Sequence, residues 1–159
     1  MKKSAVISMC KTYRYQLRRT WDEAKPVVLF IGLNPSTADA ESDDRTSRVC
    51  IGYAKRWDFG GLLLGNLFAC ISTDKSVLPH VPNPVGPKND DYLLAMQKEA
   101  CLVVCAWGDS SALRGRDTQV LSFIKNPHCL VRLKSGRPGH PLYKRAELRP
   151  IPLTDVGSA

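Results

Sequence analysis

Four short apolar runs, separated by helical and loop-like segments, constrain the fold more than any other feature of the sequence. They cover residues 27–33, 62–68, 101–107 and 129–133. Continuous apolar runs of this length are typical of strands buried on both faces of a parallel sheet. Strands that alternate with helices favour right-handed βαβ units. We therefore predict an α/β fold with three α/β/α layers around a central, mainly parallel four-stranded sheet.

The segments around these runs complete the predicted fold. Large and polar side chains alternate over residues 13–21, which predicts a half-solvated strand at the N-terminal edge of the sheet. The spacing of apolar residues predicts helices over 44–57, 89–99 and 116–125. A chain of 159 residues can bury one core, so we interpret 1–159 as a single domain. We expect the tail after about residue 150 to be flexible.

The charge balance indicates a polyanionic partner. The chain has 23 lysines and arginines against 15 acidic residues, which gives a formal net charge of +8. Such a surface attracts nucleic acid by releasing counterions, so we expect DNA as a partner, although many basic proteins bind no nucleic acid. No apolar run approaches the roughly 18 residues that a membrane span needs, and we expect a cytoplasmic protein without a membrane partner.

The cysteine and acidic residues do not form the usual metal-binding patterns. The six cysteines show no CxxC spacing, so we expect free thiols, and we predict no metal and no cofactor. The acidic residues between 39 and 44 could bind a metal ion. They also precede a predicted helix, where acidic side chains are favoured, and we interpret Asp43 or Asp44 as the helix cap. The common nucleotide-binding, zinc-protease and serine-hydrolase motifs do not occur.

Polar residues follow the apolar runs where the predicted strands end. Asn34 follows the first run, and Asn66 lies near the end of the second. Trp107 and Gly108 end the third run, and His140 lies in the loop after the fourth. The carboxyl ends of parallel strands share one edge of a sheet, and ligands bind there. We therefore predict a single site made from these loops.

Each polar residue has a chemical and a structural interpretation. Pro35 favours extended backbone at Asn34, whose amide could hold a water or could form only an Asx turn. The Asn66 amide could read the edge of a base or bond a neighbouring loop. His140, with Arg137 nearby, could donate to a developing anion or could face solvent.

A set of short motifs extends over nearly the whole chain. It comprises Tyr13-x-Tyr15-x-Leu17, Leu33-Asn34-Pro35-Ser36-Thr37-Ala38-Asp39, Asp43-Asp44-x-Thr46, Asn66-Leu67-Phe68-Ala69, Trp107-Gly108 and His140-Pro141-Leu142-Tyr143. Together these motifs resemble an uncharacterised bacterial and phage family, domain of unknown function 1643. That resemblance implies no activity by itself.

A more distant resemblance implies chemistry. Four segments are similar, in order, to motifs of the uracil-DNA glycosylase superfamily: Gly32-Leu33-Asn34-Pro35-Ser36, Leu62-Leu63-Leu64-Gly65-Asn66, Val103-Val104-Cys105-Ala106-Trp107-Gly108 and His140-Pro141. The resemblance implies the parallel-sheet α/β fold of that superfamily. This chain departs from its pattern at Ser36, where glycine is usual, and at Gly65, which is inserted before Asn66.

The superfamily resemblance also implies residue roles. Asn34 would position the water that attacks the anomeric carbon, and Asn66 would read a flipped-out base. His140 would stabilise the departing base as an anion, and Leu142 would fill the hole left in the duplex. The other implied substrate contacts are Gly32, Leu33, Pro35, Ser36, Phe68, Trp107, Gly108, Arg137, Pro141 and Tyr143.

The implied function is hydrolysis of the N-glycosidic bond of uracil or a modified pyrimidine in DNA. Two alternatives stay open from the residues alone. One is a non-catalytic protein that binds nucleic acid or nucleotides on the same fold. The other is a hydrolase that acts on free nucleosides or nucleotides.

Overall fold

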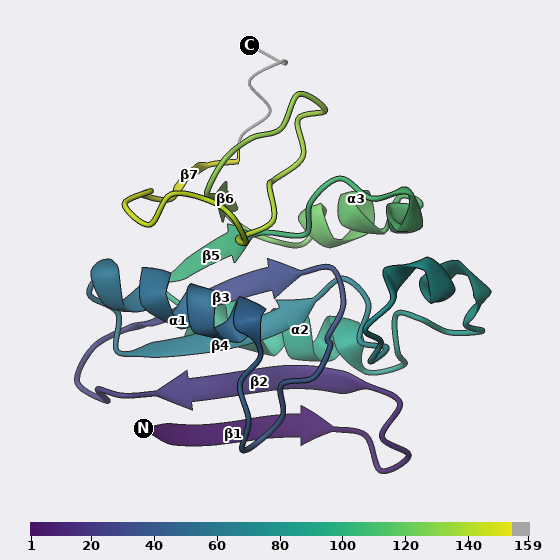
Figure 1. Cartoon of the computed structure of the whole chain (residues 1–159), viewed down its shortest axis with the longest axis horizontal. Coiled ribbons are helices and arrows are strands. Elements are labelled where there is room, and N and C mark those ends of the chain that lie inside the picture. Colours follow the sequence, from purple (N-terminus) through teal and green to yellow (C-terminus); the bar gives the residue numbers. More distant parts are fainter. Residues whose placement is uncertain (154–159) are drawn as a thin grey trace.

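The computed structural model, which describes residues 1–153, has a mixed seven-stranded sheet with helices on both faces (Figure 1). Its strand order is β1-β2-β4-β3-β5-β6-β7. The strands are β1 (Lys2–Ile7), β2 (Arg14–Thr20), β3 (Val27–Gly32), β4 (Gly61–Asn66), β5 (Leu102–Cys105), β6 (His128–Cys129) and β7 (Ile151–Pro152). The predicted α/β class is confirmed, whereas the predicted four-stranded sheet with one N-terminal edge strand has fewer strands than the observed mixed sheet.

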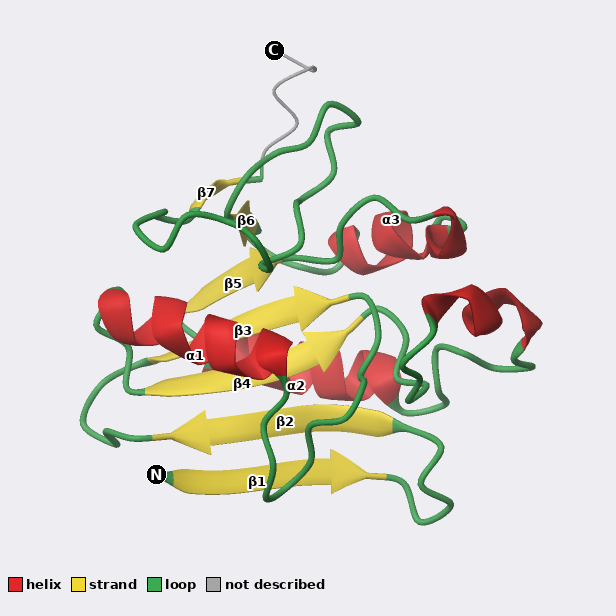
Figure 2. Cartoon of the chain, in the orientation of Figure 1, coloured by secondary structure: helices red, strands yellow, loops and turns green. Residues whose placement is uncertain are grey.

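Within residues 1–153, three α-helices and two short 3₁₀ helices connect the strands (Figure 2). They are α1 (Arg45–Arg56), η1 (Lys75–His80), α2 (Asn89–Glu99), η2 (Ser111–Leu113) and α3 (Arg116–Leu121). The sheet separates two apolar clusters, one containing side chains of α1 and the other containing side chains of α2 and α3. No helix within residues 1–153 is long and apolar enough to cross a membrane.

The sheet departs from the prediction at both edges. β4, β3, β5 and β6 pair in parallel, while β1, β2 and β7 add antiparallel pairs. Because β1 pairs with β2, β2 is not the edge strand that we predicted. The first three residues of β1 are exposed and the last three are half-buried, so backbone pairing with β2 does most to hold it and the sequence carries little sign of it.

The C-terminal part of the sheet is shorter than the apolar pattern suggested. The fourth predicted strand reduces to β6, and its antiparallel partner β7 lies just beyond residue 150. Residues 154–159, which belong to the predicted flexible tail, lie outside the described residues.

The parallel register aligns the loops after β3 and β4. Gly32 pairs with Asn66 at the ends of these strands. The backbone pairing then continues into the loops, where Leu67 N–H donates to Gly32 O at 2.9 Å and Ser72 N–H donates to Pro35 O at 2.9 Å. The segment that contains Asn34 is therefore held directly beside the segment that follows Asn66.

Helix α1 begins with a reciprocal cap. The Asp44 side chain accepts from Ser47 N–H at 2.8 Å, and Ser47 Oγ accepts from Asp44 N–H at 2.9 Å. This capping box satisfies two backbone donors and confirms the predicted cap. Because the cap fixes the start of α1, it also fixes the end of the 34–43 loop.

Two glycine-to-alanine substitutions should show opposite effects on stability, one caused by tight backbone packing and the other by helix propensity. A Cβ atom at Gly60 would lie 1.9 Å from Asp22 O, so Gly60→Ala should destabilise the fold by about 1–3 kcal/mol. Gly52 lies within α1, where a Cβ atom would meet only the movable end of Arg56, so Gly52→Ala should stabilise by about 0.5–1 kcal/mol. Urea unfolding of both variants measures the two changes; equal effects would contradict this description.

Candidate functional site

A cavity of about 100 Å³ lies at the edge of the sheet where the parallel strands end. At roughly 30 Å³ for each water it has room for about three waters, which suits a small ring better than a whole nucleotide. The lining residues are Arg14, Phe30, Gly32, Leu33, Asn34, Pro35, Ser36, Asp44, Thr46, Cys50, Leu64, Asn66, Ala106, His140 and Pro141. The structure thus brings together residues 32–36, Asn66, His140 and Pro141, which the sequence singled out.

The backbone around Asn34 fixes the orientation of its amide. Asn34 Nδ2 donates to Ser72 O at 2.9 Å, Pro35 O at 3.1 Å and Cys70 O at 3.4 Å. Carbonyl oxygens only accept, so the NH₂ group must face these loops. The opposite side of the amide carries Oδ1, the acceptor that Asn34 can offer to a water or ligand in the cavity.

Asn66 presents a buried amide whose nitrogen has no partner. Its side chain is only 6 % exposed, and Nδ2 forms no hydrogen bond within the described chain. Leaving such a donor unpaired costs about 1–3 kcal/mol. The neighbouring strand leaves room for this amide because a Cβ atom at Gly32 would lie 2.9 Å from Asn66 Oδ1. A bound group with a hydrogen-bond acceptor would relieve the cost.

His140 offers a neutral ring with a donor on Nε2. Leu142 N–H donates to Nδ1 at 3.2 Å, so in the neutral ring the proton lies on Nε2. Burial, with smaller effects of Lys144 and Lys75, lowers the pKa of His140 from its ordinary value. Protonation would also break the bond from Leu142. The ring is therefore neutral at pH 7 and can donate to an acceptor in the cavity.

Trp107, Gly108 and Arg137 position the His140 loop rather than line the cavity. Gly108 N–H donates to Pro138 O at 3.0 Å, and Trp107 packs in the core. Arg137 forms ion pairs with Asp109 at 3.0 Å and Asp117 at 2.9 Å. These contacts tie the loop to the end of β5 and to α3.

The remaining predicted contacts also lie outside the cavity lining. Phe68 is buried in the core, and Leu142 is half-buried. Tyr143 is 83 % exposed, with a left-handed φ of 62°. Arg45 lies over its ring at 4.6 Å from the centroid and donates to its hydroxyl at 2.9 Å. Tyr143, rather than the neighbouring Leu142, is therefore the side chain presented to solvent.

Sequence reasoning missed Arg14, Asp44 and Thr46 as lining residues. A register shift in the β1–β2 pairing occurs opposite Arg14. Such irregularities redirect side chains, and Arg14 faces the cavity on the α1 side, while its neighbour Tyr15 stacks on Tyr92 of α2. An arginine within an alternating strand was a visible signal, but its direction depended on this shift.

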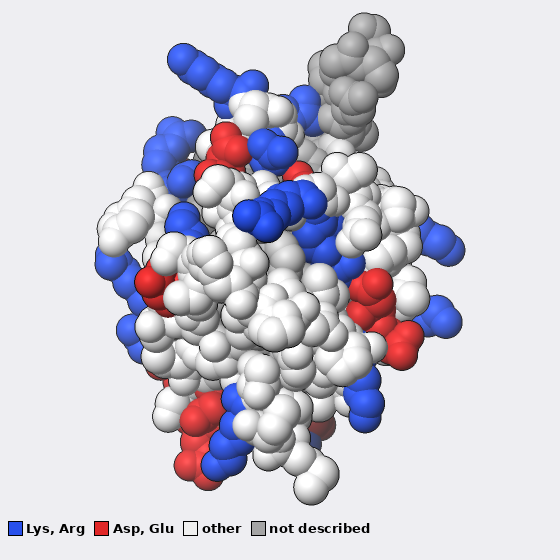
Figure 3. Space-filling view, turned by 90° about the vertical axis from the view of Figure 1, so that its right-hand side faces the viewer, with Lys and Arg blue, Asp and Glu red and all other residues white. Residues whose placement is uncertain are grey.

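The surface around the cavity is basic. Figure 3 shows the face that carries the ends of β3 and β4, where lysine and arginine side chains are spread more widely than acidic ones. Lys75 and Lys144 lie close enough to His140 to affect its ring electrostatically. This distribution suits a polyanion outside the cavity.

Comparison with known protein families identifies the family of this chain. Residues 14–142 match the family described as "Protein of unknown function (DUF1643)". The chain belongs to this family. Every residue that lines the cavity lies within the matched segment, whereas the neighbouring Tyr143 lies just outside it. Searches of curated proteins and of solved structures each gave no match, so they lend no support to the resemblance to uracil-DNA glycosylases.

The titration of His140 provides a test of the site geometry. We predict a folded-state pKa below the ordinary 6.5 because burial opposes the charged ring. Between the folded-state pKa and 6.5, the histidine of the unfolded chain is protonated more often than that of the folded chain. The free energy of unfolding should therefore fall as the pH drops from 6.5 toward the folded-state pKa. NMR titration of the ring measures this pKa. His140→Gln should remove this part of the pH dependence, and a raised pKa would contradict the prediction.

Proposed function

We propose that the protein hydrolyses the N-glycosidic bond of uracil or a modified pyrimidine in DNA. The unpartnered amide of Asn66 is the observation that carries this proposal. It lines a cavity of single-ring size together with an acceptor from Asn34 and a donor from His140. An amide offers both a donor and an acceptor, which matches the polar edge of a pyrimidine.

The chemistry follows from these three side chains. Asn34 Oδ1 accepts a hydrogen bond from a water and holds it against the anomeric carbon. The water oxygen forms the new bond to the anomeric carbon as the bond between that carbon and the base nitrogen breaks. The electron pair of the broken carbon–nitrogen bond leaves with the base. His140 Nε2–H donates to the negative charge that develops on the base, and the water proton is released to solvent.

The size of the cavity determines how a nucleotide binds. A volume of about 100 Å³ admits a base but excludes its sugar and phosphates. The target base must therefore leave the helical stack, as in other enzymes that act on bases. The phosphates would remain outside, where Lys75, Lys144 and Arg45 supply positive charge.

A second candidate is a protein that binds a base without cleaving it. The three hydrogen bonds from the Asn34 amide to backbone carbonyls favour this function, because they give Asn34 a structural role that does not require catalysis. In that case Asn66 and His140 would recognise the base, and Asn34 would only join two loops.

Substitution of the two catalytic side chains tests the reaction. We expect Asn34→Ala and His140→Ala each to lower turnover by about 10²–10⁴-fold while thermal unfolding stays cooperative. Abasic sites are measured in duplexes and single strands that carry uracil, modified pyrimidines or mismatches. His128→Ala is the control, because His128 lies in β6 and bonds Asn126 O.

The outcomes distinguish the proposed functions. Wild-type turnover in both variants would refute the assigned roles. Salt-sensitive DNA binding without abasic sites from any substrate would favour the binding protein. If DNA does not bind, free nucleosides and nucleotides become the substrates to examine.

Tyr143 should determine how the protein holds an unpaired strand. Its ring is backed by Arg45 and exposed to solvent, an arrangement that suits stacking of a base next to the extruded one. We expect Tyr143→Ala to weaken single-stranded DNA binding by about tenfold, measured by fluorescence anisotropy. Met9→Ala, in the β1–β2 turn and fully exposed, should change nothing. Equal effects of the two variants would reject the stacking role.

A further inference from the structure

Arg14 places a buried positive charge at the cavity. Its side chain is 4 % exposed, and Nη1 donates to Ala38 O at 2.9 Å. Nε has no hydrogen-bond partner within the described chain. Burial lowers the pKa of Arg14 to about 10, so the guanidinium stays charged at neutral pH. A charge in this position needs an acceptor that the protein itself does not supply.

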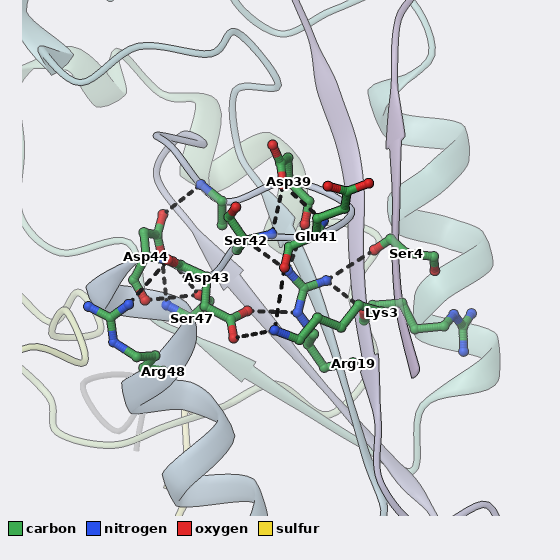
Figure 4. Close-up of polar contacts among 12 residues, drawn as sticks. Lys3, Ser4, Arg19, Asp39, Glu41, Ser42, Asp43, Asp44, Ser47 and Arg48 are labelled. Atoms are coloured by element: carbon green, nitrogen blue, oxygen red, sulfur yellow. Dashed lines mark hydrogen bonds and ion pairs between the residues drawn. The ribbon is translucent and has the colours of Figure 1, made fainter. Parts of the chain in front are cut away.

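The other buried arginines show how this protein normally satisfies such a group. Arg19, also on β2, pairs with Asp43 at 2.7 Å and donates to four backbone carbonyls (Figure 4). Arg116 pairs with Asp90 and donates to Leu67 O and Gln119. Neither lines the cavity. Arg14 differs from both because it combines a cavity position with an unused donor.

Nearby carboxylates offset the charge of Arg14 without contacting it. Asp44 and Asp39 act on it electrostatically, but no ion pair forms within the described residues. The Asp44 carboxylate is committed to capping α1 through Ser47 N–H and also accepts from Ala38 N–H. It is therefore held by the loop instead of closing onto Arg14.

Two of the buried donors at the cavity thus lack acceptors. Among the described residues, five buried side-chain polar atoms have no hydrogen-bond partner, and only Arg14 Nε and Asn66 Nδ2 among them belong to cavity-lining residues. His140 Nε2 adds a third donor. Three donors, one of them charged, are complementary to a ligand rich in acceptor oxygens.

We propose that Arg14 forms an anion subsite at this cavity, so that the preferred ligand is a small planar ring with a negatively charged oxygen group. The identity of the ring rests on the proposed function, and the charge requirement goes beyond it. The Arg14 guanidinium supplies the positive charge that pairs with the anionic oxygen, while Asn66 holds the neutral edge of the ring. A neutral ring fills the same space but leaves the Arg14 donor unpaired.

Calorimetry with two free rings tests the subsite on the full chain. The probes are uracil and orotate, which is uracil with a carboxylate on its ring. We expect orotate to bind about 10- to 100-fold more tightly than uracil, as a charge-assisted hydrogen bond predicts. Arg14→Met should abolish this preference and retain uracil binding. Arg18→Met, which removes a charge from the same strand at its contact with Glu99, should leave the preference intact.

The fold of the variants is checked by thermal unfolding. Methionine is as long as arginine up to Nε, keeps an unbranched apolar chain and avoids a buried charge, so Arg14→Met should fold. Arg14→Lys provides a second measurement, because it keeps the charge without the fork of donors and should retain only part of the preference.

The outcomes separate this inference from the proposed function. Equal binding of orotate and uracil, no binding of either ring, or a preference that persists in Arg14→Met, would overturn the anion subsite. Abasic sites from uracil-containing DNA together with equal binding would overturn it alone. An orotate preference that depends on Arg14, without abasic sites from any DNA, would support the subsite and reject the glycosylase. Arg14-dependent binding of inorganic phosphate but of neither ring would also overturn the ring-specific proposal.

Discussion

The parallel pairing of β3 with β4 is the constraint on which the candidate site depends. It sets Gly32 opposite Asn66 and continues as backbone hydrogen bonds into the loops beyond both strands. The Asn34 amide nitrogen then donates to three backbone carbonyls, one in its own loop and two in the neighbouring loop, and these bonds fix its position. A shift of one residue in this register would turn the Asn66 amide to the other face of the sheet. The acceptor of Asn34 and the donor of Asn66 share one cavity because of this register.

Two of the residues that line the cavity carry buried donors that the described chain leaves unpaired. Each unpaired buried donor costs about 1–3 kcal/mol, and a charged one costs more. Elsewhere among the described residues, Arg19 donates from its whole guanidinium and the Asn89 amide nitrogen donates to two carbonyls at the end of β4, although Asn89 Oδ1, Trp107 Nε1 and Asp117 Oδ1 also lack partners. Unsatisfied donors that converge on one small cavity are the pattern of a site prepared for a ligand.

The His140 loop reaches this cavity through contacts that are distant in sequence. Arg137 bridges Asp109 and Asp117, and the end of β5 bonds the backbone of the loop. The loop therefore has a fixed position although it contains little regular structure. This explains why Arg137, expected to contact substrate, instead supports the histidine.

Local patterns in the sequence were enough to predict the α/β class, the parallel strands at the centre of the sheet and the strand-end loops that carry Asn34, Asn66 and His140. These features follow from local apolar patterns and from the rule that parallel strands end at a common edge. The strand order, the added edge strands β1 and β7, and the position of Arg14 at the cavity could be read only from the folded structure. Exposed strands are held by backbone pairing that leaves no apolar pattern, and the direction of Arg14 depends on a register shift between two strands. Those are relations between segments, which no single stretch of sequence contains.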